Sequence, residues 1–165
     1  MTVGRNPARP RSVSATRLLG ASLAGLVAFV LARPASAALG DTAASIARDR
    51  IVMRVSQSST TPMQSYDVHR MVDPAGAVVR EYADRAGNVF AVTWHGPRSP
   101  DLKTLLGGYY DRYVAAAAQH RTGHHLVTVH APDLVLSVVR FQRVAYGRAY
   151  LPTRMPSGVT KADLR

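Results

Sequence analysis

The middle of the chain alternates short apolar runs with turn residues. Three runs of six or seven residues have the period of two, or the continuous apolar character, that is typical of strands: Tyr66–Val72, Val78–Ala83 and Val89–Trp94. Asp73-Pro74-Ala75-Gly76 and Asp84–Asn88 separate them and favour tight turns, because Pro fixes φ and Gly accepts a positive φ. This pattern predicts an antiparallel meander with Val89–Trp94 at its centre.

A helical period follows the third run. Ser99 is a favourable N-cap, Pro100 suits the first helical position, and Asp101 complements the positive end of the helix dipole. Apolar residues then recur with a period near 3.6, at Leu102, Leu105, Leu106, Tyr109, Tyr110, Tyr113, Ala116 and Ala117. The spacing predicts one long helix, at about 100–121. Gly107-Gly108 in its middle indicates either close packing on a sheet or a kink that divides the helix.

Three further strands are predicted after the helix. They are Leu126–His130, Leu134–Phe141 and Ala145–Leu151, with a turn at Pro132-Asp133 and with Gly147 as a bulge or a point of close approach. Three strands, a helix and three strands indicate the α+β class. We expect a twisted antiparallel sheet of about six strands with one long helix packed on one face.

The N-terminal pattern predicts a secretory signal peptide at 1–37. An Arg-rich start without acidic residues precedes the uncharged apolar run Leu18–Ala32, and the small residues Ala35-Ser36-Ala37 follow. The alternative is an uncleaved anchor, but the run is shorter than the roughly 20 residues of a spanning helix. We therefore expect an exported, periplasmic protein with no integral membrane span after cleavage. Residues 38–65 are expected to form an N-terminal segment with a flexible linker, and 66–165 a single domain.

Composition and charge exclude some partners and some kinds of catalysis. The chain has 21 Lys and Arg against 10 acidic residues; five of the basic residues belong to the leader, so the mature protein has a net charge of about +6. Because the basic residues are scattered, we expect no nucleic-acid partner. The absence of cysteine excludes thiol catalysis and thiolate metal sites.

Several short motifs occur in an order that resembles the DUF2844 family of exported proteobacterial proteins. They are Ala37–Gly40, Val79–Tyr82, Val89–Trp94 with Gly96-Pro97, Pro100–Leu102 with Leu105–Gly107, Pro132–Val135 and Gly147–Pro152. The resemblance covers essentially the whole mature chain and implies export and a single domain. It implies no activity, cofactor or site residue. Val138–Val144 departs from a more Gly-rich family pattern, so the last hairpin is expected to differ in detail.

Histidines are the first candidates for a site. His120, His124, His125 and His130 fall close together in the sequence, and imidazoles suit zinc, copper or nickel. The simpler interpretation is that they complement the C-terminal end of the helix dipole. No nucleophile elbow, phosphate loop or carboxylate pair is evident, so the sequence predicts no catalytic residue and no cofactor.

Aromatic residues suggest a possible interaction surface, made of Trp94, His95, Tyr109, Tyr110 and Tyr113. The alternative for the tryptophan and the tyrosines is a place in the core. The sequence thus favours an exported, non-catalytic envelope protein that binds another exported protein or an envelope polymer. A metal- or small-ligand-binding protein that uses the histidines is the alternative, and an unrecognised hydrolase is a third. Oligomeric state is not specified.

Overall fold

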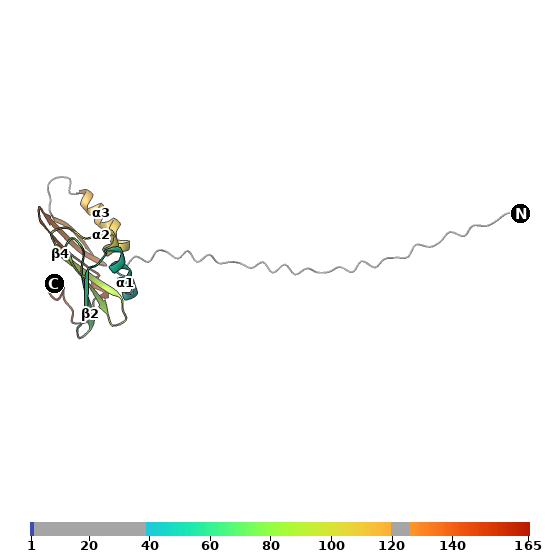
Figure 1. The fold of residues 1–165 in the computed structure, drawn as a ribbon, viewed down its shortest axis with the longest axis horizontal. Coiled ribbons are helices and arrows are strands. Elements are labelled where there is room, and N and C mark those ends of the chain that lie inside the picture. Colours follow the sequence, from blue (N-terminus) through green and yellow to red (C-terminus); the bar gives the residue numbers. More distant parts are fainter. Residues whose placement is uncertain (2–38, 120–125) are drawn as a thin grey trace. The chain divides into compact units, whose positions relative to one another are not determined.

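The computed structural model describes residues 39–119 and 126–165, together with Met1. All its helices and strands belong to the unit Ala32–Arg165 (Figure 1). The strands are β1 (Gln57–Pro62), β2 (Tyr66–Val72), β3 (Val78–Asp84), β4 (Val89–Gly96), β5 (Leu126–Ala131), β6 (Leu134–Phe141) and β7 (Val144–Tyr150). The helices are α1 (Ala43–Val52), α2 (Leu102–Leu106) and α3 (Tyr110–Gln119), with short 3₁₀ turns at Gly107–Tyr109 and Pro152–Arg154.

One antiparallel sheet contains all seven strands in the order β1-β2-β3-β4-β7-β6-β5. It consists of two meanders, β1 to β4 and β5 to β7, joined where β4 pairs with β7. The predicted α+β class is therefore confirmed, and β4 is central, as its apolar sequence indicates. Two finer expectations, six strands and one long helix, are only approximate.

The additional strand comes from the segment that was expected to be a linker. β1 pairs with β2 from Gln57 opposite Val72 to Pro62 opposite Asp67. All six of its residues are exposed, and neither face of the strand needs apolar side chains. Its sequence QSSTTP therefore has no apolar period from which a strand could be predicted. Pro62 is tolerated because β1 is an edge strand. Just before β1, α1 buries Ile46 against the sheet.

The predicted long helix is broken at Gly107. This residue has φ 48° and ψ −121°, a conformation that favours glycine, and a 3₁₀ turn there separates α2 from α3. The helical start also lies later than predicted. Asp101 is the N-cap of α2, and its carboxylate accepts from the backbone amides of Lys103 at 3.0 Å and Thr104 at 3.3 Å. The hydroxyl of Ser99 instead accepts from Arg140 Nε.

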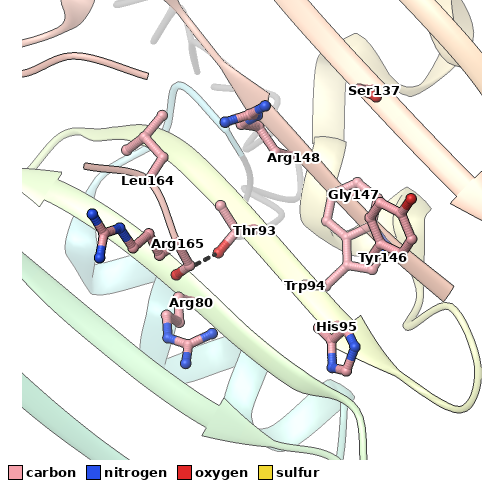
Figure 2. Close-up of a pocket in the computed structure, with 10 residues that line it drawn as sticks. All are labelled: Arg80, Thr93, Trp94, His95, Ser137, Tyr146, Gly147, Arg148, Leu164 and Arg165. Atoms are coloured by element: carbon pink, nitrogen blue, oxygen red, sulfur yellow. Dashed lines mark hydrogen bonds between the residues drawn. The ribbon is translucent and has the colours of Figure 1, made fainter. Parts of the chain in front are cut away.

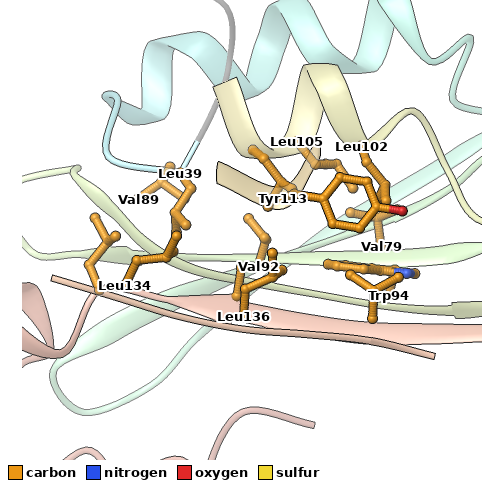
Figure 3. Packing of buried hydrophobic residues seen from close by; sticks show 14 of the residues in the cluster. Leu39, Val79, Val89, Val92, Trp94, Leu102, Leu105, Tyr113, Leu134 and Leu136 are labelled. Carbon is orange, nitrogen blue, oxygen red and sulfur yellow. The ribbon is translucent and has the colours of Figure 1, made fainter. Parts of the chain in front are cut away.

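The main core lies between the helices and one face of the sheet (Figure 3). Leu105 and Leu106 of α2 are fully buried against strand residues such as Val92, Trp94 and Leu136. We call this face of the sheet the covered face. Burying side chains of this size stabilises the fold by roughly 1.5–3 kcal/mol each, which explains why the helices remain on this face.

Gly147 allows Trp94 to pack flat on the sheet. The two residues are paired across β4 and β7, and a Cβ at Gly147 would overlap the indole ring. The predicted close approach at Gly147 is therefore present, and its cause is the tryptophan on the neighbouring strand.

The opposite face, which we call the open face, carries a smaller apolar cluster on β2, β3 and β4. Tyr66, Tyr82 and Phe90 contact one another there, with ring centroids 5.8–6.3 Å apart. Leu164, from the segment that follows β7, is buried against them. The Tyr82 hydroxyl donates to the backbone oxygen of Arg165 at 2.7 Å. This C-terminal segment covers part of the open face, where Thr93 is buried and Arg80 and Arg148 are half-buried.

Candidate binding face

A row of polar side chains crosses the open face from one edge of the sheet to the other. Residues paired directly across antiparallel strands point to the same side, so the strand register defines the row without ambiguity. Its members, in spatial order, are Ser59, Arg70, Arg80, Thr93, Arg148, Ser137 and Thr128. We call it the arginine–hydroxyl row. Every member carries a hydrogen-bond donor, and none is acidic or apolar.

Two adjacent hollows lie along this row. The first, of about 200 Å³, is lined by Arg80, Thr93, Arg148 and Arg165, among others (Figure 2). The second, of about 190 Å³, is lined by Thr128, Ser137, Arg148 and Lys161, among others. Because Arg148 and Ser137 line both, the hollows adjoin each other along the row, and we call the two together the track.

The guanidinium groups of the row have no carboxylate partner among the described residues. The ion pairs found there are Arg85 with Asp67 at 2.9 Å and Arg112 with Asp133 at 2.7 Å. In the row itself, Arg148 Nη1 donates to the backbone oxygen of Lys161 at 3.0 Å. The positive charge of the row is therefore balanced by solvent and counter-ions, and it is available to a ligand.

Aromatic side chains flank the row. On one side lies Tyr146, 44% exposed and paired with His95 of β4, which is also exposed. On the other side lies Tyr150, half-buried and paired with Ala91. Figure 2 shows Tyr146 and His95 at one end of the first hollow. The track thus combines cationic donors with flat, amphipathic rings.

Of the predicted aromatic surface, only part is accessible. Trp94 is 2% exposed and Tyr113 is 8% exposed, so both belong to the core, which was the alternative for them. Tyr109 and Tyr110 are half-buried and pack against that core, and Arg112 lies 5.9 Å from the centroid of the Tyr109 ring. His95 is the one member of the set that faces the open side of the sheet.

The predicted histidine site is only partly within the structure. His120, His124 and His125 lie outside the described residues. His130 is exposed at the end of β5 and lines the second hollow. Among residues 39–119 and 126–165, no group of three or more His, Asp or Glu side chains has the arrangement of a metal site.

The sequence interpretation missed a pair of buried carboxyl groups under the helices. Asp49 of α1 is 1% exposed and Glu81 of β3 is 2% exposed. Asp49 Oδ2 and both oxygens of Glu81 have no donor within the described part of the chain. A proton on Asp49 would supply the missing donor between the two groups. The pair lies on the covered face, where neither hollow reaches it.

Burial dominates the titration of this pair. Desolvation raises the pKa of Asp49, and the neighbouring Glu81 charge raises it further. Desolvation also raises the pKa of Glu81, against the opposing effect of Asp49 as a hydrogen-bond donor and of the Arg50 charge. Arg48 lowers and Asp101 raises the pKa of Asp49. His69, paired with Glu81 across β2 and β3, has its pKa lowered by burial.

These features define a class of protein: a seven-stranded antiparallel α+β domain with one face sealed by helices and a cationic track on the other. The chain belongs to the DUF2844 family, described as "Protein of unknown function", whose model matches residues 35–164. The resemblance read from the sequence motifs is thereby confirmed. Comparison with curated proteins and with solved structures finds no significant match.

Proposed function

We propose that this protein is an exported, non-catalytic binding module of the cell envelope and that its open face is the binding surface. The observation that carries the proposal is the asymmetry of the sheet. Helices seal the covered face, whereas the open face presents a hollowed track with unpaired positive charge. The leader-like pattern of residues 1–37 supports the export part of the proposal.

The separation of Ser137 from His95 in the first hollow favours a binding function over nucleophilic catalysis. Ser137 and His95 both line it, but they lie on β6 and β4, which are separated by β7. Strands two apart are about 10 Å apart, too far for a serine–histidine hydrogen bond. Within the described residues, His95 makes no ion pair with a carboxylate that could orient it as a base.

Export is tested by cell fractionation and N-terminal sequencing of the protein expressed from its full sequence. We expect a mature chain in the periplasmic fraction that begins at Ala38. Full-length protein in the cytoplasm would overturn this part. A chain that remains attached to the membrane through residues 1–37 would overturn cleavage. Among the described residues, no helix is long and apolar enough to cross a membrane.

The binding face is tested by photo-cross-linking in intact cells. A photoreactive residue at Tyr146 samples the open face, and the matched position Val114, 45% exposed on α3, samples the opposite side. The two positions have nearly the same exposure, so accessibility alone predicts equal labelling. We expect cross-linked species from Tyr146 and far fewer from Val114. Equal yields, or products from Val114 alone, would contradict the proposal.

A further inference from the structure

The arginine–hydroxyl row has a composition that folding alone does not favour. Arg70 and Arg80 lie directly opposite each other on neighbouring strands. Like charges in that position destabilise a sheet. No carboxylate of the described residues pairs with either side chain. A negatively charged ligand would remove this repulsion, so the row is better explained by what it binds than by what it stabilises.

The track is suited to a chain rather than to a single ion. Arg80 and Arg148 lie on strands on either side of β4, about 10 Å apart by strand spacing. The two hollows continue from Arg80 past Arg148 to Thr128 and Lys161. One small anion would occupy one hollow and leave the other empty. A linear polyanion laid along the row would contact both arginines and, beyond Arg148, the hydroxyls of Ser137 and Thr128. Thr93, between the arginines, is buried and bonded to the C-terminal segment.

The donors and rings of the track match an acidic sugar chain. A guanidinium binds a planar carboxylate with two parallel hydrogen bonds. The hydroxyls of Ser137 and Thr128 are able to donate to and accept from sugar hydroxyls. Tyr146 and Tyr150, on the two sides of the row, offer flat amphipathic faces on which a sugar ring can rest.

We infer that the arginine–hydroxyl row binds an acidic polysaccharide, with Arg80 and Arg148 each receiving a carboxylate of the chain. This inference rests on the proposed function only in taking the open face as the binding surface. The C-terminal segment lies beside the track, where Thr93 donates to the backbone oxygen of Arg165 at 3.4 Å. The segment thereby fixes Thr93 and accepts one hydrogen bond from Arg148 through the backbone oxygen of Lys161, and neither arginine has a carboxylate partner among the described residues.

Calorimetric titration of the mature protein with polygalacturonate tests the inference, with uncharged dextran as the matched polymer. We expect binding to polygalacturonate that weakens as salt is added, and none to dextran. Arg80→Gln and Arg148→Gln should each weaken binding about fivefold to tenfold. Arg80→Lys, which keeps the charge but loses the planar fork, should fall between the wild type and Arg80→Gln.

Arg48→Gln is the control, because it removes the same charge from an exposed position of α1 on the covered side. Ser137→Ala, which changes no charge, gives a second variant of the row and should weaken binding severalfold. Circular dichroism at the titration temperature verifies that each variant is folded.

Three outcomes would overturn the inference. The first is equal loss of affinity in Arg48→Gln and Arg80→Gln, which would indicate attraction by net charge alone. The second is equal binding of dextran. The third is failure to bind polygalacturonate while vesicles containing phosphatidylglycerol are bound, which would assign the row to lipid headgroups. Photo-cross-links from Tyr146 would persist in the third case, so the proposed binding face would survive the loss of the polysaccharide inference.

Discussion

The two faces of the sheet treat charge in opposite ways. On the covered face, Asp49 and Glu81 are sealed from water and lack a donor among the described residues. On the open face, Arg80 and Arg148 are half-buried, and neither forms an ion pair with a described carboxylate. Burial favours the neutral form of a carboxyl group, so a proton replaces the missing partner. A guanidinium stays charged at any ordinary pH, so the open face keeps its positive charge.

This contrast separates stability from binding. Substitutions on the covered face should change the free energy of unfolding and leave ligand affinity intact in the folded fraction. Substitutions in the arginine–hydroxyl row should do the reverse. The following predictions test that separation, beginning with the largest expected effect.

Gly147→Ala should be the most damaging of these changes. The added Cβ would overlap the Trp94 ring and approach the backbone oxygen of Ser137 at 2.6 Å. Overpacking of this kind costs typically 1–3 kcal/mol, and we expect about 3 kcal/mol because a backbone atom also obstructs the methyl group. Denaturant unfolding followed by Trp94 fluorescence measures the loss.

Gly108→Ala is its matched control. A Cβ at Gly108 meets no atom within 4 Å, and the residue lies in the 3₁₀ turn between α2 and α3. The same glycine-to-alanine change should therefore leave stability unchanged or raise it by about 0.5 kcal/mol, through the unfolded state. If the two variants lose equal stability, close packing under Trp94 is not the reason for the glycine at 147.

The buried carboxyl pair predicts a loss of stability at alkaline pH. The pKa is raised to about 7 for Glu81 and to about 9 for Asp49, mainly by burial. The folded protein therefore binds more protons than the unfolded chain, and stability falls as pH rises toward these values. Between pH 7 and pH 9, above the range where histidines titrate, we expect the free energy of unfolding to fall by about 2 kcal/mol.

Glu81→Gln should flatten this pH dependence, because an amide stays neutral and is able to donate to Asp49. At pH 9 the variant should be more stable than the wild type. Asp111→Asn, at an exposed position in the first turn of α3, should keep the wild-type slope. Chemical denaturation at pH 7, 8 and 9 provides the comparison. An unchanged slope in Glu81→Gln would show that the pair is not the cause.

Arg80→Thr should raise the free energy of unfolding slightly, whereas Gly147→Ala should lower it. It removes the repulsion between Arg70 and Arg80 and adds a β-branched residue to β3. We expect a gain of about 0.5 kcal/mol together with the loss of ligand affinity described above. Thermal unfolding without ligand measures the gain. A marked loss of stability would mean that Arg80 serves the fold and not the open face.

The sequence predicted the apolar strands and missed the elements that lack an apolar period. Val89–Trp94 was identified because it is apolar on both sides, and β4 indeed lies at the centre of the sheet. β1 was missed because both its faces meet solvent. The break at Gly107 was foreseen as one of two possibilities, since two adjacent glycines allow a kink but also allow close packing.

The candidate site could be recognised only from the register of the strands, which the sequence alone does not give. Alternation within β3 places Arg80 and Glu81 on opposite faces, and that much follows from the sequence. Arg80 shares a row with Thr93 and Arg148 because β3 pairs with β4 and β4 pairs with β7. No period in the sequence predicts the pairing of β4 with β7. The contact between Asp49 and Glu81 could not be predicted for the same reason, because the two residues meet only when α1 packs on the sheet.

The pairing of β4 with β7 also bears on how the chain reaches this fold. Within each meander, neighbouring strands are close in sequence and can pair early with little loss of loop entropy. The pairing of β4 with β7, which joins the two meanders, brings together residues as far apart in the sequence as Ala91 and Tyr150. The helices α2 and α3 lie between them in the chain. Non-local pairings of this kind are slow to form. The track spans the pairing of β4 with β7, so the surface that we propose for binding should form in the last step of folding.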